Sequence, residues 1–175
     1  CGFCCSSSIL DKRWRAMSVT KSLERIMDPV QRFNLSGVWI RDDEFYVDNR
    51  RAFTICERIF RGPRQIHWYA TGSRVDDFNR CTDDQIELIK LSGGRITKFG
   101  AESGCDRILD LIQKGFHTED TLRANQRCRK HGIIPAYSLI VGFPTETFAE
   151  MNQTIDFGFR LKRENPKVQL ETLQG

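Results

Sequence analysis

The sequence lacks the features of a membrane protein or an exported protein. No apolar run approaches the ~20 residues that a membrane-spanning helix needs, and no signal peptide is present. Blocks of like charge are also missing: 27 basic and 23 acidic residues are mixed along the chain and give a net charge of +4. Nucleic acid is therefore not the expected partner, and we expect a cytoplasmic protein that binds no membrane.

Histidine is scarce, and the cysteines do not form a disulfide framework. The three histidines are far apart in the sequence, so they offer no second ligand pair for a zinc site. The seven cysteines are odd in number, the chain is not small, and its sequence shows no export signal. Four of them are scattered, which is typical of small buried side chains. Three of them, Cys1, Cys4 and Cys5, crowd the N-terminus and need another explanation.

The overall amino-acid composition is typical of a globular domain. The chain has 175 residues, of which 39% are hydrophobic and 29% are charged, and this length suits one domain with a real core. It begins with Cys1 and ends at Gly175, just after an apparent strand. We expect both ends to be cut and the chain to be a piece of a longer protein.

Helical and strand patterns alternate along the chain with short connections. Ser18 is a suitable N-cap for the first helix, Pro29 is expected to kink or split that helix, and Pro135 is expected to break a strand. The predicted helices span 19–33, 49–60, 82–92, 105–113, 118–130 and 145–162, and the predicted strands span 37–40, 66–70, 96–101, 133–141 and 168–173. Such alternation predicts parallel strands with right-handed crossovers, in either a (β/α) barrel or a doubly wound sheet.

The N-terminal Cys1-Gly2-Phe3-Cys4 has the C-x2-C spacing that lets two thiolates share one centre. A zinc site, an iron–sulfur cluster and a redox dithiol are all compatible with this spacing, as are simple buried thiols. The loop alone does not decide among them. A thioredoxin-like dithiol would open a helix after a strand, whereas a polar segment follows here.

Glycines and charged side chains follow the predicted strands, where the chemistry of parallel sheets collects. Each segment alone is compatible with an ordinary turn or helix cap, whereas four in order after a cysteine loop favour a binding site. The segments are Asp42-Asp43-Glu44, Ser73-Arg74-Val75-Asp76, Gly100 to Gly104, and Gly142 to Thr147.

With these motifs, the whole chain closely resembles the radical S-adenosylmethionine (SAM) superfamily, in particular the branch that often carries a cobalamin-binding domain upstream. The cluster loop of that family is C-x3-C-x2-C with an aromatic residue before the last cysteine. Cys1 and Cys4 match its second and third cysteines, with Phe3 as the aromatic residue. The first cysteine would lie four residues before Cys1. Cys5 does not complete the set, because the third ligand would then fall on Ser8.

The resemblance extends to the strand ends and implies their roles. The segment from Ile40 to Phe45 resembles the strand end that approaches the SAM amino group, and Arg74 follows a strand whose arginine approaches the SAM carboxylate. The turn from Phe99 to Gly104 resembles the one at the ribose. The segment Leu139 to Thr147 resembles the one that flanks the adenine. The implied SAM-pocket residues are Asp42, Asp43, Arg74, Glu102, Ser103 and Gly142, and the implied cluster ligands are Cys1 and Cys4.

The resemblance implies a partial (β/α)6 TIM-type barrel over residues 1–175, a radical SAM core without its first cluster cysteine and upstream domain. It implies a [4Fe-4S] cluster and SAM as cofactors, with cobalamin supplied through an upstream domain. The implied activity is reductive cleavage of SAM to a 5′-deoxyadenosyl radical, for cobalamin-linked methyl transfer or cyclase-type chemistry on a small-molecule substrate. The electron donor would be a flavodoxin or ferredoxin, and the fragment alone would be inactive.

The alternatives are a methylthiotransferase-like radical SAM enzyme, a non-catalytic metal-binding barrel, and a zinc or flavin barrel with incidental cysteines. No residue of the sequence identifies the substrate.

Overall fold

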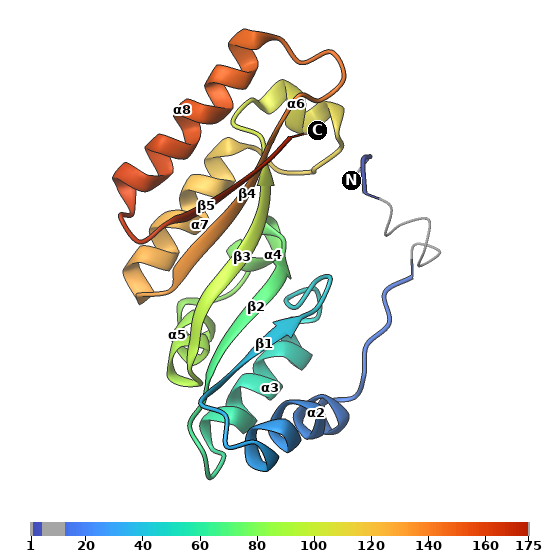
Figure 1. The fold of residues 1–175 in the computed structure, drawn as a ribbon, viewed down its shortest axis with the longest axis vertical. Helices are drawn as coiled ribbons and strands as arrows, with labels where there is room; N and C mark the ends of the chain where they lie inside the picture. The colour runs from blue at the N-terminus through green and yellow to red at the C-terminus, as the bar shows by residue number, and fades with distance from the viewer. Residues whose placement is uncertain (1, 5–12, 175) are drawn as a thin grey trace.

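The computed structural model describes residues 2–4 and 13–174, and a twisted parallel sheet runs through its whole length (Figure 1). Within this part of the chain the sheet has five strands in the order β1-β2-β3-β4-β5, all parallel. The strands are β1 (Gly37–Arg41), β2 (His67–Ser73), β3 (Gly94–Glu102), β4 (Ile134–Val141) and β5 (Gln169–Gln174).

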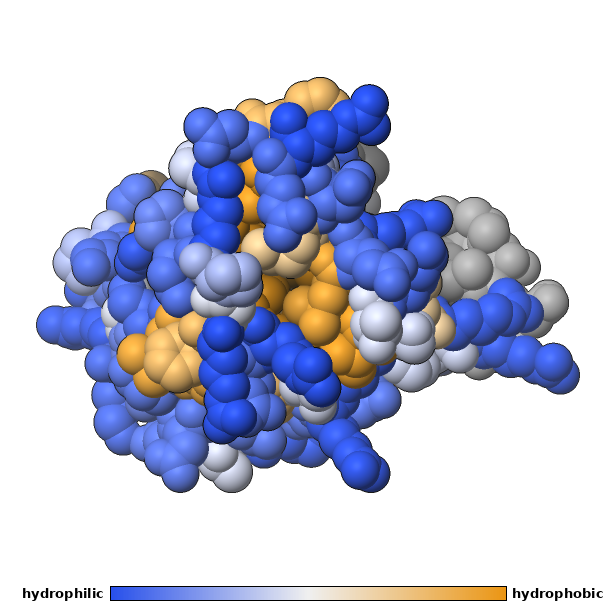
Figure 2. Space-filling view, turned by 90° about the horizontal axis from the view of Figure 1, so that it is seen from below, coloured by the Kyte–Doolittle hydropathy of each residue, from blue (hydrophilic) through white to orange (hydrophobic). Residues whose placement is uncertain are grey.

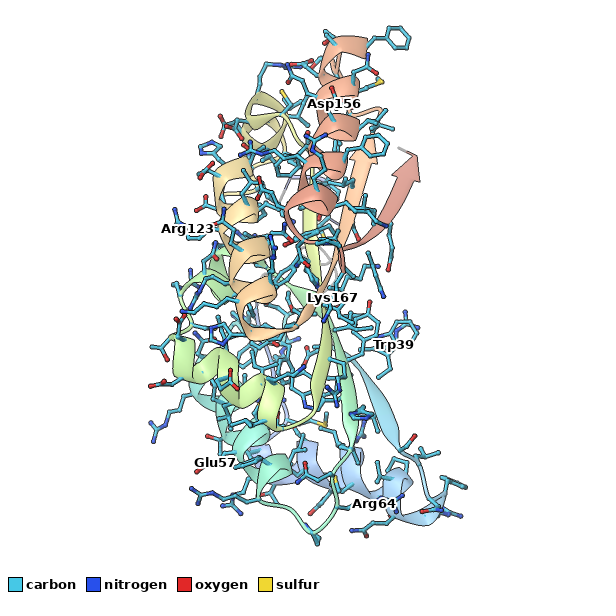
Figure 3. All side chains as sticks on the ribbon, turned by 90° about the vertical axis from the view of Figure 1, so that its left-hand side faces the viewer. Trp39, Glu57, Arg64, Arg123, Asp156 and Lys167 are labelled. Carbon is cyan, nitrogen blue, oxygen red and sulfur yellow. The ribbon has the colours of Figure 1, made fainter. Side chains whose placement is uncertain are left out.

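The helices alternate with the strands and lie on one side of the sheet. Figure 3 shows the helices on one side and Trp39 of β1 pointing away from them. The helices are α2 (Val19–Arg32), α3 (Asn49–Phe60), α4 (Val75–Asn79), α5 (Asp83–Leu91), α6 (Asp106–Leu111), α7 (Thr118–His131) and α8 (Phe148–Glu164).

The strand order decides between the two architectures that the sequence leaves open. A doubly wound sheet reverses its strand order and carries helices on both faces. Here each strand pairs with the next one in the chain, and the helices cover a single face (Figures 1 and 3). The α/β fold with parallel strands, as in an arc of a (β/α) barrel, is therefore confirmed. Five strands lie in the described part of the chain, where the barrel prediction has about six.

Local signals place most helix ends correctly. The Ser18 side chain accepts a hydrogen bond from the Lys21 amide and caps α2, and Thr82 forms a capping box with Gln85 at the start of α5. Gly132 ends α7 at φ +69°, in the left-handed region that glycine adopts readily.

Several details differ from the sequence prediction, among them the unpredicted short helix α4 between β2 and α5. Helix α2 continues through Pro29 without a split, and α8 begins after Thr147 rather than at Thr145. Strand β4 runs through Pro135 unbroken. Pro135 is tolerated because β4 and β5 pair only from Ala136 onward, so its missing N–H removes no bond to β5.

The core lies between the helices and the sheet. Trp68, Tyr46, Phe78 and Phe99 are among its largest buried side chains. The scattered cysteines Cys56, Cys81, Cys105 and Cys128 are buried, as predicted. Burial raises the pKa of the Cys56 thiol to about 12 and that of Cys81 to about 11, which keeps both protonated.

The face of the molecule seen from below is mainly polar (Figure 2). Seen from below, from the side of α2 and α3, polar side chains surround a recessed apolar patch (Figure 2). None of the helices in the described ranges is long and apolar enough to cross a bilayer.

Candidate SAM and cluster site

The carboxyl ends of β1 and β2 are held in close contact through Gly72. The Phe45 amide donates to the Gly72 carbonyl at 2.9 Å. A Cβ on Gly72 would lie 2.1 Å from the Asp42 carbonyl oxygen and 2.4 Å from that of Asp43, and Gly72 has φ +67°. Only glycine permits this approach. The close contact fixes the turn that carries Asp42 and Asp43 beside the end of β2.

Glu44 links the ends of β1 and β2 through a second contact, made by its side chain. Its carboxylate oxygen Oε1 accepts a hydrogen bond from the Arg74 amide at 3.1 Å. Burial raises the pKa of Glu44 to about 7, an effect that the backbone hydrogen bond and the Arg74 charge oppose. Glu44 belongs to the Asp42-Asp43-Glu44 segment but is not among the predicted SAM-pocket residues.

Arg74 follows β2 and is oriented by its neighbours. Its guanidinium donates from Nε to Asp76 Oδ1 at 2.9 Å and from Nη2 to Asp76 Oδ2 at 3.0 Å, a two-point contact. Nη2 also donates to the Lys114 carbonyl at 2.7 Å. The guanidinium carbon lies 5.7 Å from the centre of the Phe116 ring. Arg74 is half-buried at this edge of the sheet, and its role toward the SAM carboxylate stays a prediction.

Glu102 ends β3 in a buried ion pair with Lys114. Lys114 Nζ donates to Glu102 Oε1 at 2.8 Å, and the two side chains are only 6% and 10% exposed. Glu102 has φ +66°, a strained conformation for a residue with a side chain. The carboxylate folds back over Gly100, because a Cβ there would lie 2.2 Å from Glu102 Oε1.

Ser103 is buried and bonded within the protein. Its Oγ lies 3.1 Å from Thr154 Oγ1 of α8 and accepts a hydrogen bond from the Cys105 amide at 3.0 Å. These contacts anchor the β3–α6 turn to α8. The role of Ser103 in a SAM pocket stays a prediction.

Gly142 follows β4 at φ +95°. Its amide and that of Phe143 donate to Glu146 Oε2 at 2.6 and 3.0 Å. One carboxylate oxygen therefore closes the turn, and the Gly142 backbone stays exposed at the end of the strand.

The described part of the cysteine loop lies against this same edge. The Gly2 amide donates to the Ile112 carbonyl at 2.6 Å, and the Phe3 ring meets the Phe143 ring edge-on at 5.6 Å between centroids. Cys4 is exposed. Cys1 and Cys5 lie outside the described residues, so their predicted roles stay predictions.

A cleft of about 500 Å³ opens on the sheet face opposite the helices. Asp42, Asp43, Gly72 and Gly100 line it near the strand ends. Farther from the strand ends, the Trp39 and Tyr69 rings line the cleft and stack on each other. Their centres are 5.2 Å apart and their planes differ by 6°. Of the predicted SAM-pocket residues, Asp42 and Asp43 therefore line this cleft, and Gly100 of the Glu102 turn lies beside them. Ser103 instead bonds to Thr154 of α8.

Lys114 is the residue that sequence reasoning missed. Its side chain contacts Glu102, 12 positions away, and its carbonyl contacts Arg74, 40 positions away. A lone lysine in a loop gives no signal of such contacts. Its near-complete burial, with 5% exposed, is visible only in the folded chain.

Comparison with known proteins identifies the family of the chain. The model of the radical SAM superfamily matches residues 1–158. The chain belongs to the radical SAM superfamily.

Two curated proteins similar to this radical SAM chain cover most of it. An "uncharacterized methyltransferase" of Pyrococcus horikoshii is 34% identical over 92% of the chain and 34% of its own length. The anaerobic magnesium-protoporphyrin IX monomethyl ester cyclase of Rubrivivax gelatinosus is 24% identical over 88% of the chain and 28% of its own length. The radical SAM chain thus spans about a third of these relatives.

A solved structure shares the fold. OxsB, a cobalamin-dependent SAM radical enzyme determined with aqua-cobalamin and SAM bound, superposes with a TM-score of 0.72 at 22% identity. The match covers 84% of this radical SAM chain and 23% of OxsB.

Proposed function

We propose that this chain is the core of a radical SAM enzyme that holds a [4Fe-4S] cluster and SAM at the carboxyl edge of its sheet. The observation that carries the proposal is the arrangement of this edge. The cysteine loop packs on Ile112 and Phe143, beside the turns of β3 and β4. Carboxylates, an arginine and exposed glycine backbone follow the neighbouring strands.

The donor set fits an iron–sulfur cluster in part. Cys1 and Cys4 supply two thiolates at C-x2-C spacing, and Phe3 anchors their loop through its contact with Phe143. Cysteine four positions before Cys1 would supply the third. When bound, such a cluster supplies the electron that cleaves the carbon–sulfur bond of SAM to give the 5′-deoxyadenosyl radical.

The chain's own residues would bind and orient SAM. Asp42 and Asp43 offer carboxylates to its amino group, and the Arg74 guanidinium, oriented by Asp76, offers donors to its carboxylate. The Glu102 carboxylate lies on the Gly100 backbone, where it can accept hydrogen bonds from ribose hydroxyls. Gly142 presents bare backbone, which lets a flat adenine approach closely.

We further propose that the enzyme performs cobalamin-linked methyl transfer or cyclase-type chemistry on a small molecule, with a flavodoxin or ferredoxin as electron donor. The names of the relatives support this reaction class: one is a methyltransferase, one a cyclase and one a cobalamin-dependent enzyme. Cobalamin would be bound outside the described residues. The Trp39–Tyr69 stack and the cleft beside it are the proposed place for the substrate.

Anaerobic reconstitution with iron and sulfide tests the proposal. The protein used is the chain preceded by a Cys-x-x-x segment, here called the extended chain. We expect a brown protein with about four iron and four sulfide per chain and visible cluster absorption. Cys1→Ser and Cys4→Ser should each abolish it, and Cys5→Ser should not. A colourless protein that binds one zinc would contradict the proposal.

A further inference from the structure

The loop between α6 and α7 contacts three parts of the proposed site. The Ile112 carbonyl accepts the Gly2 amide of the cysteine loop. Two residues later, Lys114 contacts the end of β3 with its side chain and the residue after β2 with its carbonyl. The α6–α7 loop, which carries no predicted ligand itself, therefore contacts the cysteine loop and the two segments that carry Glu102 and Arg74.

Lys114 is buried, and Glu102 is its one charged hydrogen-bond partner in the part of the chain that the structure describes. Its ammonium lies 2.8 Å from Glu102 Oε1 and 5.6 Å from the Phe116 ring centre. Arg74 lies 5.7 Å from the same ring, so two cations flank one buried aromatic side chain. Burying an ammonium and a carboxylate is costly, and surface ion pairs would serve the fold as well. The burial is therefore better explained by the position that it gives to Glu102.

The second oxygen of Glu102 has no hydrogen-bond donor within residues 2–4 and 13–174. Lys114 occupies Oε1 alone, and this oxygen lies where a Gly100 side chain would stand. Gly100 lines the cleft, so the carboxylate is fixed at its wall. The positive φ of Glu102 directs its side chain back toward Gly100, and the ion pair with Lys114 holds the carboxylate in this position.

We propose that Lys114 is a positioning residue that fixes the Glu102 carboxylate and the Arg74 guanidinium relative to each other for binding SAM. This inference rests on the proposed function. Lys114 does not touch SAM in this account. It acts through Glu102 with its side chain and through Arg74 with its carbonyl, so the effect of changing its side chain should depend on Glu102.

The test is the affinity of the 175-residue chain for SAM, measured by equilibrium dialysis with radiolabelled SAM. We expect Lys114→Met to weaken binding about tenfold or more, and Lys114→Arg to restore part of the loss. Lys90→Met is the control, because Lys90 is a half-buried lysine far from the strand ends and donates to the Gly132 carbonyl at 3.1 Å, before β4 begins. It should bind SAM like the wild type.

A double-mutant cycle separates positioning from general damage to the fold. In the Glu102→Gln background, Lys114→Met should change SAM affinity less than about threefold, because the group it positions is already altered. This double variant also removes both buried charges, so it stays testable if the single variant unfolds. Wild-type affinity in Lys114→Met, or an equal loss in both backgrounds, contradicts the inference alone. A wild-type chain that binds no SAM contradicts the proposed function, and the inference fails with it.

Discussion

The Phe3 ring packs edge-on against the Phe143 ring, with 5.6 Å between the ring centres. Phe3 lies between the two cysteines of the C-x2-C pair, and Phe143 follows Gly142, the residue directly after β4. The contact links the proposed cluster loop to the proposed adenine side of the pocket. It gives the aromatic residue of the cysteine motif a physical role, which is to anchor the loop.

Phe3→Ala should weaken retention of the cluster with little effect on folding. Phe3 is 45% exposed, so its loss removes little core packing, whereas loss of an orienting contact around a metal site costs about 10-fold in affinity. The measurement is the iron that remains on the reconstituted extended chain during a chelator titration. Phe33→Ala is the control, since Phe33 is 63% exposed at the end of α2. Equal iron retention in both variants would refute the anchoring role.

Asp42→Asn and Asp43→Asn should each weaken SAM binding by about tenfold, because each removes a charged acceptor for the SAM ammonium. Asp42 is half-buried and Asp43 is exposed in the turn after β1, so thermal stability should stay close to that of the wild type. Binding is measured by equilibrium dialysis, with Asp84→Asn on the outer helix α5 as control. Unchanged affinity in both site variants would exclude this turn from the pocket.

Glu44 should make stability depend on pH between about 4.5 and about 7. Its pKa is raised from 4.5 to about 7 by burial, so the folded chain holds a proton that the unfolded chain has already lost in this range. Stability contributed by this group therefore falls as pH rises. Glu44→Gln cannot ionise, and its melting temperature should rise relative to the wild type between pH 4.5 and pH 8. A constant difference across that range would show that Glu44 ionises normally.

Gly72→Ala should destabilise the fold more than Gly132→Ala, although the two glycines have nearly the same φ of +67° and +69°. At Gly132 the nearest atom to a Cβ is a flexible lysine end at 3.5 Å, so the cost is about 1–2 kcal/mol for the backbone alone. At Gly72 the Cβ would overlap the Asp42 carbonyl, which adds about 1–3 kcal/mol of strain. Urea denaturation midpoints compare them, and equal losses would mean that the two strand ends can separate freely.

The fold was largely predictable because its signals are local. Ser18, Thr82 and Gly132 mark helix ends through their own backbone contacts, and apolar periodicity marks the strands between them. Pro135 misled the prediction because its effect depends on where β5 begins to pair. Helix α4 was missed because it is only five residues long and starts directly after the β2 turn.

The candidate site was predictable only in part, because tertiary contacts assign its roles. The sequence order indicates which turns lie at the carboxyl edge, and the structure places Asp42, Asp43, Arg74, Glu102 and Gly142 there. The sequence order cannot indicate that Ser103 bonds to Thr154, 51 positions away, or that Lys114 forms an ion pair with Glu102. Those contacts depend on how α8 and the α6–α7 loop return to the sheet.

The most direct test of the account is whether the reconstituted extended chain converts SAM to 5′-deoxyadenosine under anaerobic reduction, followed by chromatography. We predict that 5′-deoxyadenosine accumulates as SAM is consumed, that Cys4→Ser abolishes it, and that the 175-residue chain alone produces none. An extended chain that carries its full cluster and leaves SAM intact would contradict the central claim that this edge is a radical SAM site.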